Sequence, residues 1–522
     1  MSKIIQIVAS PSEAFSEETI QVFLKKKNLW EKDDSILKVR KKSIDARQRD
    51  IKINLRVEIY KKGEEIPPSF IAPNYLDVST KPKVIVVGAG PAGLFCALKL
   101  IELQLCPIVI ERGLDVRARR RDLANINKKH LVNPESNYCF GEGGAGTYSD
   151  GKLYTRSTKR GDVQSILNTM VYFGANENIL TEAHPHIGTN KLPGIISSMR
   201  EQIIASGGEV RFSTKLTDIV SEKGVCTGVV VNNEETIFSK AIVLATGHSA
   251  RDIFYLLDKK HITIEFKPFA LGVRAEHPQS VIDKIQYHCE DRGEYLPPAS
   301  YSLVEQVEGK GVYSFCMCPG GIIAPCATDS QEVVTNGWSP SKRNNPWANS
   351  GMVVTVNWED IPEFHQYGPL AGLEFQKSVE HKCWQAGGMN QTAPAQRIID
   401  FIENKKSTSL PECSYQPGLK SVNLQDILPF FITNALRRGL KSFGKKMRGY
   451  LHPEAIIVAT ESRTSSPVRI PRDPLTLEHI CLKQFYPCGE GAGYAGGIVS
   501  AAIDGEKIAI KIAERLADPQ LG

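Results

Sequence analysis

The glycines that follow the apolar run at residues 84–87 have the type and spacing of a site for a dinucleotide. Gly88, Gly90 and Gly93 form a GxGxxG pattern between that run and an apolar segment of helical length. In such a turn the first glycine lets the chain leave the strand sharply, the second admits a pyrophosphate close to the backbone, and the third lets the helix pack on the strand. The free N–H groups at the helix start then face the phosphates.

An acid at the end of the next apolar run selects among dinucleotides. Glu111 follows the glycines by about 20 residues, the spacing of a carboxylate that binds the adenosine ribose. A carboxylate accepts hydrogen bonds from ribose hydroxyls but repels a 2′-phosphate, so NADP is disfavoured even with Arg112 next to it. NAD and the adenosine half of FAD remain as ligands.

Three further segments place glycines where a ligand would need close approach to the backbone. Residues 137–156 combine several glycines with aromatic residues, and the apolar run AIVLATG at 241–247 stops at a glycine. The glycine-rich segment 485–497 leads into a helix predicted from Ile498. Because open α/β folds bind ligands at the carboxyl ends of their strands, we expect these segments and the first glycine turn to meet at one groove.

Periodicity and turn signals divide the chain into four stretches. Residues 1–80 have a βαββ pattern followed by the Pro-rich segment EEIPPSFIAPN, which predicts a small ferredoxin-like α+β domain and a linker. Residues 81–260 form the first part of a nucleotide-binding domain, residues 261–455 a substrate or cap domain of mixed character, and residues 456–522 the C-terminal part of the nucleotide-binding domain. The expected fold class is α/β.

Composition excludes several classes of protein. Of the 522 residues, 41% are hydrophobic and 23% charged, and no apolar run reaches the roughly 18 residues of a membrane span. The net charge of +6 is small for this length, and the lysines of the first domain are not interleaved with aromatic residues, so nucleic acid is not expected as a partner. The twelve cysteines lack zinc spacing and are typical of buried thiols in a reducing cytoplasm, so we expect no metal site and a cytoplasmic location.

The motifs together resemble a known group of flavoproteins. GAGPAG with Glu111, ATG at 245–247 and GEGAGYAGGI at 489–498 are similar to the three FAD-contact segments of the glutathione-reductase type of FAD-binding fold. Nearly the whole chain resembles the family of uncharacterised FAD-dependent dehydrogenases, through KKSIDARQRDI, FGEGGAGTYSDGKL, ATGHSARD, KPFALGVRAEHP, YSFCMCPGG and ESRTSSPVR. The resemblance implies a Rossmann-like FAD-binding domain with an inserted mixed α+β substrate or cap domain.

The resemblance also implies which residues contact FAD. The loop from Gly141 to Gly146 corresponds to the one that passes beside the flavin, and Glu490 stands where many relatives have Asp. A helix N-terminus at Gly497 and Ile498 would stabilise the negative charge of a reduced flavin. The expected contacts are Gly88, Gly90, Pro91, Ala92, Gly93, Glu111, Arg112, Gly141, Gly143, Gly144, Ala145, Gly146, Thr246, Gly247, Gly489, Glu490, Gly497 and Ile498.

The candidates for catalysis come from polar clusters outside the glycine segments. His186 in HPHIGTN either orients a substrate or belongs to a turn. Arg274 and Glu276 share a face of a predicted strand and either bind an acid or form a structural ion pair. Arg463, near the SSP sequence, is a candidate to meet an anionic substrate.

Two cysteines form a further candidate cluster. Cys316 and Cys318 share a face of a short predicted strand, so they are either a thiol pair facing the flavin or small buried residues. Cys318 is the catalytic candidate of the two. The second interpretation is favoured because CxC is not the usual redox spacing and because no basic neighbour is evident to lower their pKa.

These features predict an FAD-dependent oxidoreductase that transfers a hydride between non-covalent FAD and an unidentified small molecule. GxGxxG also matches residues 141–146 and 491–496, but only the pattern at Gly88–Gly93 has the strand-like run before it and the acid Glu111 after it. NAD(P)H would therefore act as a transient electron donor rather than occupy a second nucleotide domain. Two other classes stay open: a non-redox or RNA-modifying FAD enzyme, and an NAD-dependent enzyme without flavin. The sequence does not indicate the oligomeric state.

Overall fold

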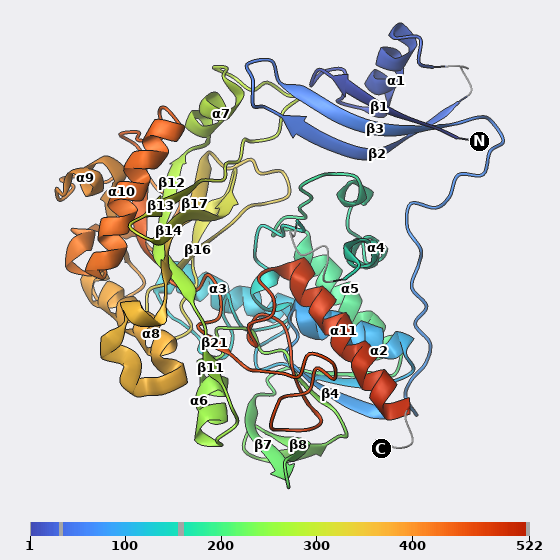
Figure 1. Ribbon diagram of the computed structural model, residues 1–522, viewed down its shortest axis with the longest axis vertical. Coiled ribbons are helices and arrows are strands. Elements are labelled where there is room, and N and C mark those ends of the chain that lie inside the picture. Colours follow the sequence, from blue (N-terminus) through green and yellow to red (C-terminus); the bar gives the residue numbers. More distant parts are fainter. Residues whose placement is uncertain (1, 31–34, 155–160, 518–522) are drawn as a thin grey trace.

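The computed structural model describes residues 2–30, 35–154 and 161–517, which form a mixed α/β structure with parallel and antiparallel sheets. Figure 1 shows a large body, in which helices surround two sheets, and a small N-terminal unit. A long extended segment runs along the outside from that unit to β4 (Figure 1). Within the described ranges, no helix has the length and apolar character that a membrane crossing requires.

The N-terminal unit is a three-stranded antiparallel sheet with one helix. Its elements, with sheet order β1-β3-β2, are β1 (Lys3–Ala9), α1 (Glu17–Lys26), β2 (Ile36–Asp45) and β3 (Lys52–Tyr60). Alternate residues of β3 from Ile53 to Ile59 are buried in one core with α1, as expected for a strand with one solvated face. Lys25 and Lys26 lie in the last turn of α1, where positive charge stabilises the helix dipole. Their clustering therefore has a structural reason.

Strand β2 joins this unit to the rest of the molecule. The backbone N–H of Lys42 donates to the carbonyl of Thr181 at 2.9 Å, and the N–H of Ala183 donates to the carbonyl of Lys42 at 3.0 Å. Phe15 packs edge-on against Tyr295, with ring centroids 5.1 Å apart. Lys42 therefore belongs to the contact between the two parts of the chain.

A five-stranded parallel sheet carries the first glycine turn. Its order is β22-β10-β4-β5-β6. The strands are β4 (Lys83–Val87), β5 (Cys106–Ile110), β6 (Glu209–Arg211), β10 (Ile242–Leu244) and β22 (Phe485–Pro487). Helices α2 (Pro91–Glu102), α3 (Val116–Lys129), α4 (Val163–Tyr172), α5 (Leu192–Ala205), α6 (Arg251–Lys259) and α11 (Ile498–Ala517) lie between or after these strands.

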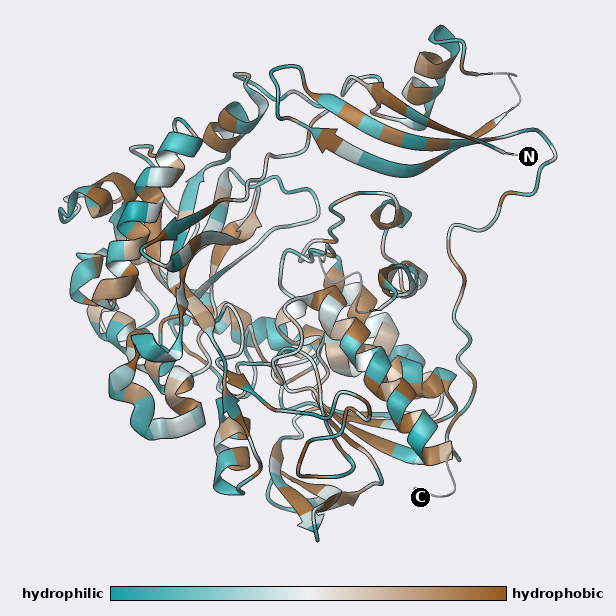
Figure 2. Ribbon diagram, viewed as in Figure 1, coloured by the Kyte–Doolittle hydropathy of each residue, from teal (hydrophilic) through white to brown (hydrophobic). Residues whose placement is uncertain are grey.

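Both faces of this sheet are covered, as parallel sheets require. Val84 and Val86 point into a core with α2, α5 and α11, whereas Ile85 and Val87 point into a second core. That second core contains α6 and the small antiparallel sheet of β7 (Leu216–Glu222), β8 (Val225–Val231) and β9 (Glu235–Phe238). Figure 2 shows the resulting hydrophobic colour of β4.

A seven-stranded sheet forms the other half of the body, in the order β13-β14-β17-β12-β20-β18-β19. Its strands are β12 (Phe269–Pro278), β13 (Val304–Val307), β14 (Lys310–Cys318), β17 (Trp347–Val356), β18 (Ala393–Arg397), β19 (Leu419–Ser421) and β20 (Ile456–Glu461). It shares one core with α7 (Gln279–Tyr287), α8 (Ala371–Gly387), α9 (Ile398–Glu403) and α10 (Phe430–Lys446). Two further pairs are β11 (Glu265–Phe266) with β21 (Val468–Arg469), and β15 (Ile322–Pro325) with β16 (Thr335–Trp338).

One boundary expected from the sequence needs correction. The sequence analysis ends the cap domain at residue 455, but β20 lies beyond it and pairs with β12 and β18 inside the seven-stranded sheet. We therefore place this boundary after β20. The long apolar run IIVAT resembles a strand of either sheet, and only its pairing partners decide which sheet it joins.

Candidate functional site

A cavity of about 420 Å³ lies at the carboxyl ends of β4, β5 and β10, within the size range of small-molecule sites. Its wall includes the turns that follow these three strands, the loop at residues 138–152 and the start of α11. Residues 315–338 and 463–464 add a wall from the side of the seven-stranded sheet. The structure therefore brings the glycine segments near residues 90, 145 and 497 to one cavity.

In the first glycine turn, the fold itself requires glycine at two positions but not at the third. Gly88 has φ +104°, and a Cβ there would lie 2.4 Å from the carbonyl oxygen of Ala245. A Cβ at Gly93 would lie 1.9 Å from the carbonyl oxygen of Gly88, so this glycine permits close packing of helix and strand. Gly90 has φ −77°, which any residue adopts, and a Cβ there would meet no atom within 4 Å. Because Gly90 faces the cavity as the N-cap of α2, its missing side chain leaves room for a ligand at that helix N-terminus.

The second helix N-terminus repeats this arrangement. Helix α11 begins at Ile498, as the sequence predicts, and a Cβ on Gly496 or Gly497 would again meet no atom within 4 Å. A Cβ at Gly146 would lie 3.2 Å from Pro91 and 3.6 Å from Ile498. The turn at Gly144–Gly146 therefore lies between the first residues of α2 and α11, and all three elements line the cavity.

A buried arginine holds the loop that contains this turn. Arg119, on α3, is fully buried and directs all five of its N–H groups into residues 137–147. Its Nε donates to the carbonyl of Asn137 at 2.7 Å, and its Nη2 donates to the carbonyls of Tyr138 and Gly144, both at 2.9 Å. Its Nη1 donates to the carbonyl of Glu142 at 2.9 Å. The loop conformation therefore depends on this side chain.

Glu111 is placed at the cavity wall but already has partners. One carboxylate oxygen accepts the N–H of Ala89 at 2.9 Å, and the other accepts those of Gly113 at 3.0 Å and Gly141 at 2.9 Å. A carboxylate offers about four acceptor sites, so it retains capacity for one more donor. Neighbouring Arg112 pairs with Asp252, so its charge already has a carboxylate partner.

An ion pair lies where the start of α11 meets the turn after β10. Nδ1 of His248 lies 3.2 Å from a carboxylate oxygen of Glu490, and its Nε2 lies 3.1 Å from the carbonyl oxygen of Arg463. Both ring nitrogens therefore face oxygen atoms that can only accept a hydrogen bond. Burial would raise the pKa of Glu490, but the hydrogen bond and charge of His248 lower it, together with the N–H of Gly497.

Some residues expected to contact the cofactor lie behind the wall instead. A Cβ at Gly141 would lie 2.6 Å from Arg119, and one at Gly489 would lie 2.9 Å from Ala92. These glycines allow close packing of the wall itself, contrary to the expectation from the resemblance. The residues concerned, which do not line the cavity, are Gly93, Gly141, Gly143 and Gly489.

Three of the catalytic candidates lie outside the cavity wall: Arg274 and Glu276 are buried, and His186 is half-buried. Arg274 donates to Asn349 at 2.9 Å and pairs with Glu461 at 3.2 Å, so its ion-pair partner is not Glu276. The carboxylate of Glu276 accepts two hydrogen bonds from Ser414, and burial raises its pKa to about 7. His186 bonds through Nε2 to the carbonyl of Ser341 at 3.1 Å. Each of the three therefore has hydrogen-bond partners within the protein and lies outside the lining of this cavity.

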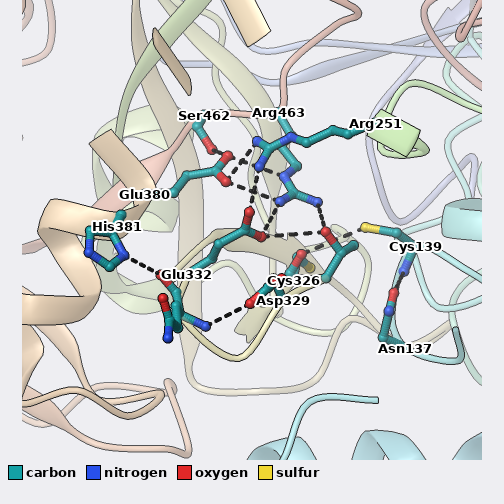
Figure 3. A network of polar contacts seen from close by, with 12 residues as sticks. Asn137, Cys139, Arg251, Cys326, Asp329, Glu332, Glu380, His381, Ser462 and Arg463 are labelled. Atoms are coloured by element: carbon teal, nitrogen blue, oxygen red, sulfur yellow. Dashed lines mark hydrogen bonds and ion pairs between the residues drawn. The ribbon is translucent and has the colours of Figure 1, made fainter. Parts of the chain in front are cut away.

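Arg463 lines the cavity but belongs to a buried ionic network, drawn in Figure 3. Its guanidinium pairs with Glu332 at 2.6 Å and Glu380 at 3.0 Å, and donates to Thr328 at 2.8 Å. Arg251 pairs with the same two carboxylates from α6. Burial alone would raise the pKa of Glu380, yet the two arginines lower it to about 2. With its charge neutralised in this way, Arg463 joins α8 and β20 to the cavity wall rather than presenting a free cation to a substrate.

The structure gives the cysteine pair a basic neighbour that the sequence analysis did not expect. Cys316 lines the cavity and Cys318 lies behind it. Nζ of Lys152 lies 3.9 Å from the sulfur of Cys316 and 4.0 Å from that of Cys318. The expectation that no cation adjoins these thiols is therefore wrong, because a lysine distant in the sequence is folded against them.

Sequence reasoning missed Arg119, Lys152 and His248. Only Arg119 carries a local signal: it occupies the buried stripe of α3 with Val116, Leu123 and Ile126, where an arginine is out of pattern. The other two acquire their partners from segments far away in the chain.

Comparisons with known proteins agree with parts of this picture. Residues 268–464 match the family described as "FAD-dependent protein, C-terminal domain-like", and residues 1–60 match a domain of unknown function. An uncharacterised protein of Clostridium beijerinckii is 41% identical over 515 residues, which cover 95% of this chain and 96% of the relative.

Several solved structures are similar to the chain at low identity. FqzB is 14% identical over 86% of this chain and 82% of its own, with a TM-score of 0.34. CtdE in complex with FAD is 11% identical over 83% of this chain and 85% of its own, with a TM-score of 0.32. The flavin-dependent brominase Bmp2 is 12% identical over 83% of this chain and 78% of its own, with a TM-score of 0.35.

Proposed function

The chain belongs to the family of the Clostridium beijerinckii protein, and we propose that it is an FAD-dependent oxidoreductase that moves a hydride between non-covalent FAD and a small molecule. The observation that carries the proposal is the pair of helix N-termini directed at one cavity. Each has a glycine at which an added Cβ would meet no protein atom within 4 Å. Gly90, the N-cap of α2, and Gly496, just before α11, leave space for a ligand at this cavity. The match of residues 268–464 to FAD-dependent proteins supports the choice of FAD.

Each part of the wall has a role in this proposal. The N-terminus of α2 binds the pyrophosphate through its free N–H groups, and the fourth acceptor site of Glu111 binds a hydroxyl of the adenosine ribose. The N-terminus of α11 at Ile498 stabilises negative charge at the other end of the cavity. The bound flavin supplies two-electron redox chemistry. The protein residues position it and exclude water.

The far wall of the cavity is where a substrate would bind. Phe315, Asn336 and Trp338 come from the seven-stranded sheet and its neighbouring hairpin, facing the glycine turns across the cavity. An aromatic and amide surface suits a planar organic molecule with few charges. We propose reduced nicotinamide as the electron donor, docking transiently because the described chain has no second glycine turn of the Gly88–Gly93 kind.

Absorbance and anaerobic reduction test this function. Purified protein, or protein reconstituted with FAD, should show the flavin bands and release FAD on denaturation. Anaerobic addition of NADH or NADPH should bleach the bands. Protein that binds NAD and takes up no FAD after reconstitution would refute the proposal in favour of an enzyme without flavin.

A further inference from the structure

The strand that carries Cys316 departs from regular geometry at the cavity wall. In β14 the register against β17 shifts between Phe315 and Cys318, which leaves one extra residue on β14. Cys316 itself has φ +46°, a conformation that costs a residue with a Cβ free energy. Bulges of this kind re-aim side chains and recur beside active sites. Here the irregular residue is the one whose side chain lines the cavity.

Two cations surround the two thiols. Besides contacting both sulfurs, Nζ of Lys152 donates to the carbonyl of Met317. Nη2 of Arg274 lies 3.5 Å from the sulfur of Cys318 and donates to the carbonyl of Cys316 at 2.7 Å. Burial would lower the pKa of Lys152, but the adjoining sulfurs and a nearby carboxylate raise it, so the ammonium stays charged. This environment favours a thiolate.

The two sulfurs differ in their ionisation. Interaction with the Cys318 thiol lowers the pKa of Cys316 well below its usual value, and the charges of Lys152 and Arg274 act in the same direction against burial. The same interaction, together with burial, raises the pKa of Cys318 well above its usual value. The cysteine at the cavity wall is therefore the one whose pKa is lowered, and the one behind it is the one whose pKa is raised, as in a pair of nucleophilic and resolving cysteines.

We propose that Cys316 and Cys318 form a redox-active pair that alternates between dithiol and disulfide and exchanges two electrons with the flavin. The inference rests on the proposed function, since it places the flavin in the same cavity. On oxidation, a bond forms between the two sulfurs, the S–H bond of Cys318 breaks, and one proton leaves. The oxidised flavin accepts the two electrons and one proton. The cysteine pair is thereby a second two-electron redox group beside the flavin, at the wall where substrate would bind.

Anaerobic reductive titration of the flavin-loaded protein tests the exchange. Dithionite should deliver about four electrons per flavin to air-oxidised wild type and about two to Cys316→Ser and Cys318→Ser. Cys481→Ser is the control, because Cys481 is exposed and does not line the cavity, and it should behave as wild type. A wild type that takes up no more electrons than Cys316→Ser would overturn the proposal.

Alkylation and peptide mass separate this inference from the flavin assignment. In thiol–disulfide buffers of graded potential, the peptide that holds both cysteines should change in one step between doubly alkylated and disulfide-linked, with or without FAD. Lys152→Gln should move the pH profile of Cys316 alkylation by iodoacetamide upward by about one unit and slow the reaction about tenfold on the acid side of that profile, since one pKa unit changes the thiolate fraction tenfold there. Protein that binds no flavin yet forms the disulfide would refute the proposed function and the electron partner. A peptide that stays doubly alkylated at every potential would refute the pair itself.

Discussion

Replacing Arg119 by methionine should destabilise the loop that forms one wall of the cavity. The side chain donates five hydrogen bonds, four of them to backbone carbonyls of residues 137–144 that are buried with it. A hydrogen bond from a charged donor contributes about 1.5 to 3 kcal/mol, so the gross loss is roughly 7 to 15 kcal/mol. Methionine avoids the several kcal/mol that burial of a guanidinium costs, which leaves a net loss of about 3 to 5 kcal/mol.

Thermal denaturation measures this effect. With an unfolding entropy of about 2.1 cal/mol/K per residue, a 522-residue chain that unfolds as a unit should melt about 3 to 5 °C lower. Arg121→Met is the control, because Arg121 lies exposed on the same helix and the change removes the same charge. FAD affinity should also fall in Arg119→Met, since its loop lies against the starts of α2 and α11. Equal melting temperatures and equal flavin affinities in the two variants would refute the reasoning.

Three other substitutions probe the site and its surroundings. Gly90→Val adds a side chain in open space, so flavin content should fall about tenfold or more at an unchanged melting temperature, whereas Gly194→Ala, also open but outside the cavity wall, should change neither. Burial raises the pKa of Glu276 from 4.5 to about 7, so between these pH values the carboxyl is neutral in the folded state and ionised in the unfolded state. The free energy of unfolding therefore falls as pH rises through this range. The wild type should therefore lose about 3 kcal/mol over that range, and denaturation of Glu276→Gln at a series of pH values should lack this part of the slope. Arg463→Met removes a positive charge from buried carboxylates and should lower the free energy of unfolding by roughly 3 to 5 kcal/mol. Adding Glu380→Gln in the double variant should restore part of that loss, and additive losses would contradict the coupling of the two residues.

The glycine turns could be read from the sequence because their requirements are local. A strand that must turn into a helix at Gly88 needs a positive φ there, and a helix that packs on the strand needs Gly93. Hydrophobic periodicity likewise indicated β4, α2 and α11 at the positions where they occur. Each of these signals lies within a few residues of the feature it predicts.

The roles of single polar side chains were harder to predict because they depend on partners elsewhere. Arg274 was expected to relate to Glu276, its neighbour on the strand face, but pairs with Glu461 from an adjacent strand. Arg463 was expected to be free for an anion, but two carboxylates from other parts of the chain neutralise it. A charged residue alone cannot reveal whether folding supplies its counterion.

The amino-acid sequence alone determined where the backbone turns, which faces are apolar and that a dinucleotide is the expected ligand, since these follow from short-range sterics and periodicity. Only the tertiary structure decided which side chains meet at the cavity. Lys152 and Cys316 stand 164 residues apart and lie close together because the loop that holds Lys152 folds against β14. Charge, burial and reactivity at that wall depend on distances in space, and no local pattern in the chain encodes them.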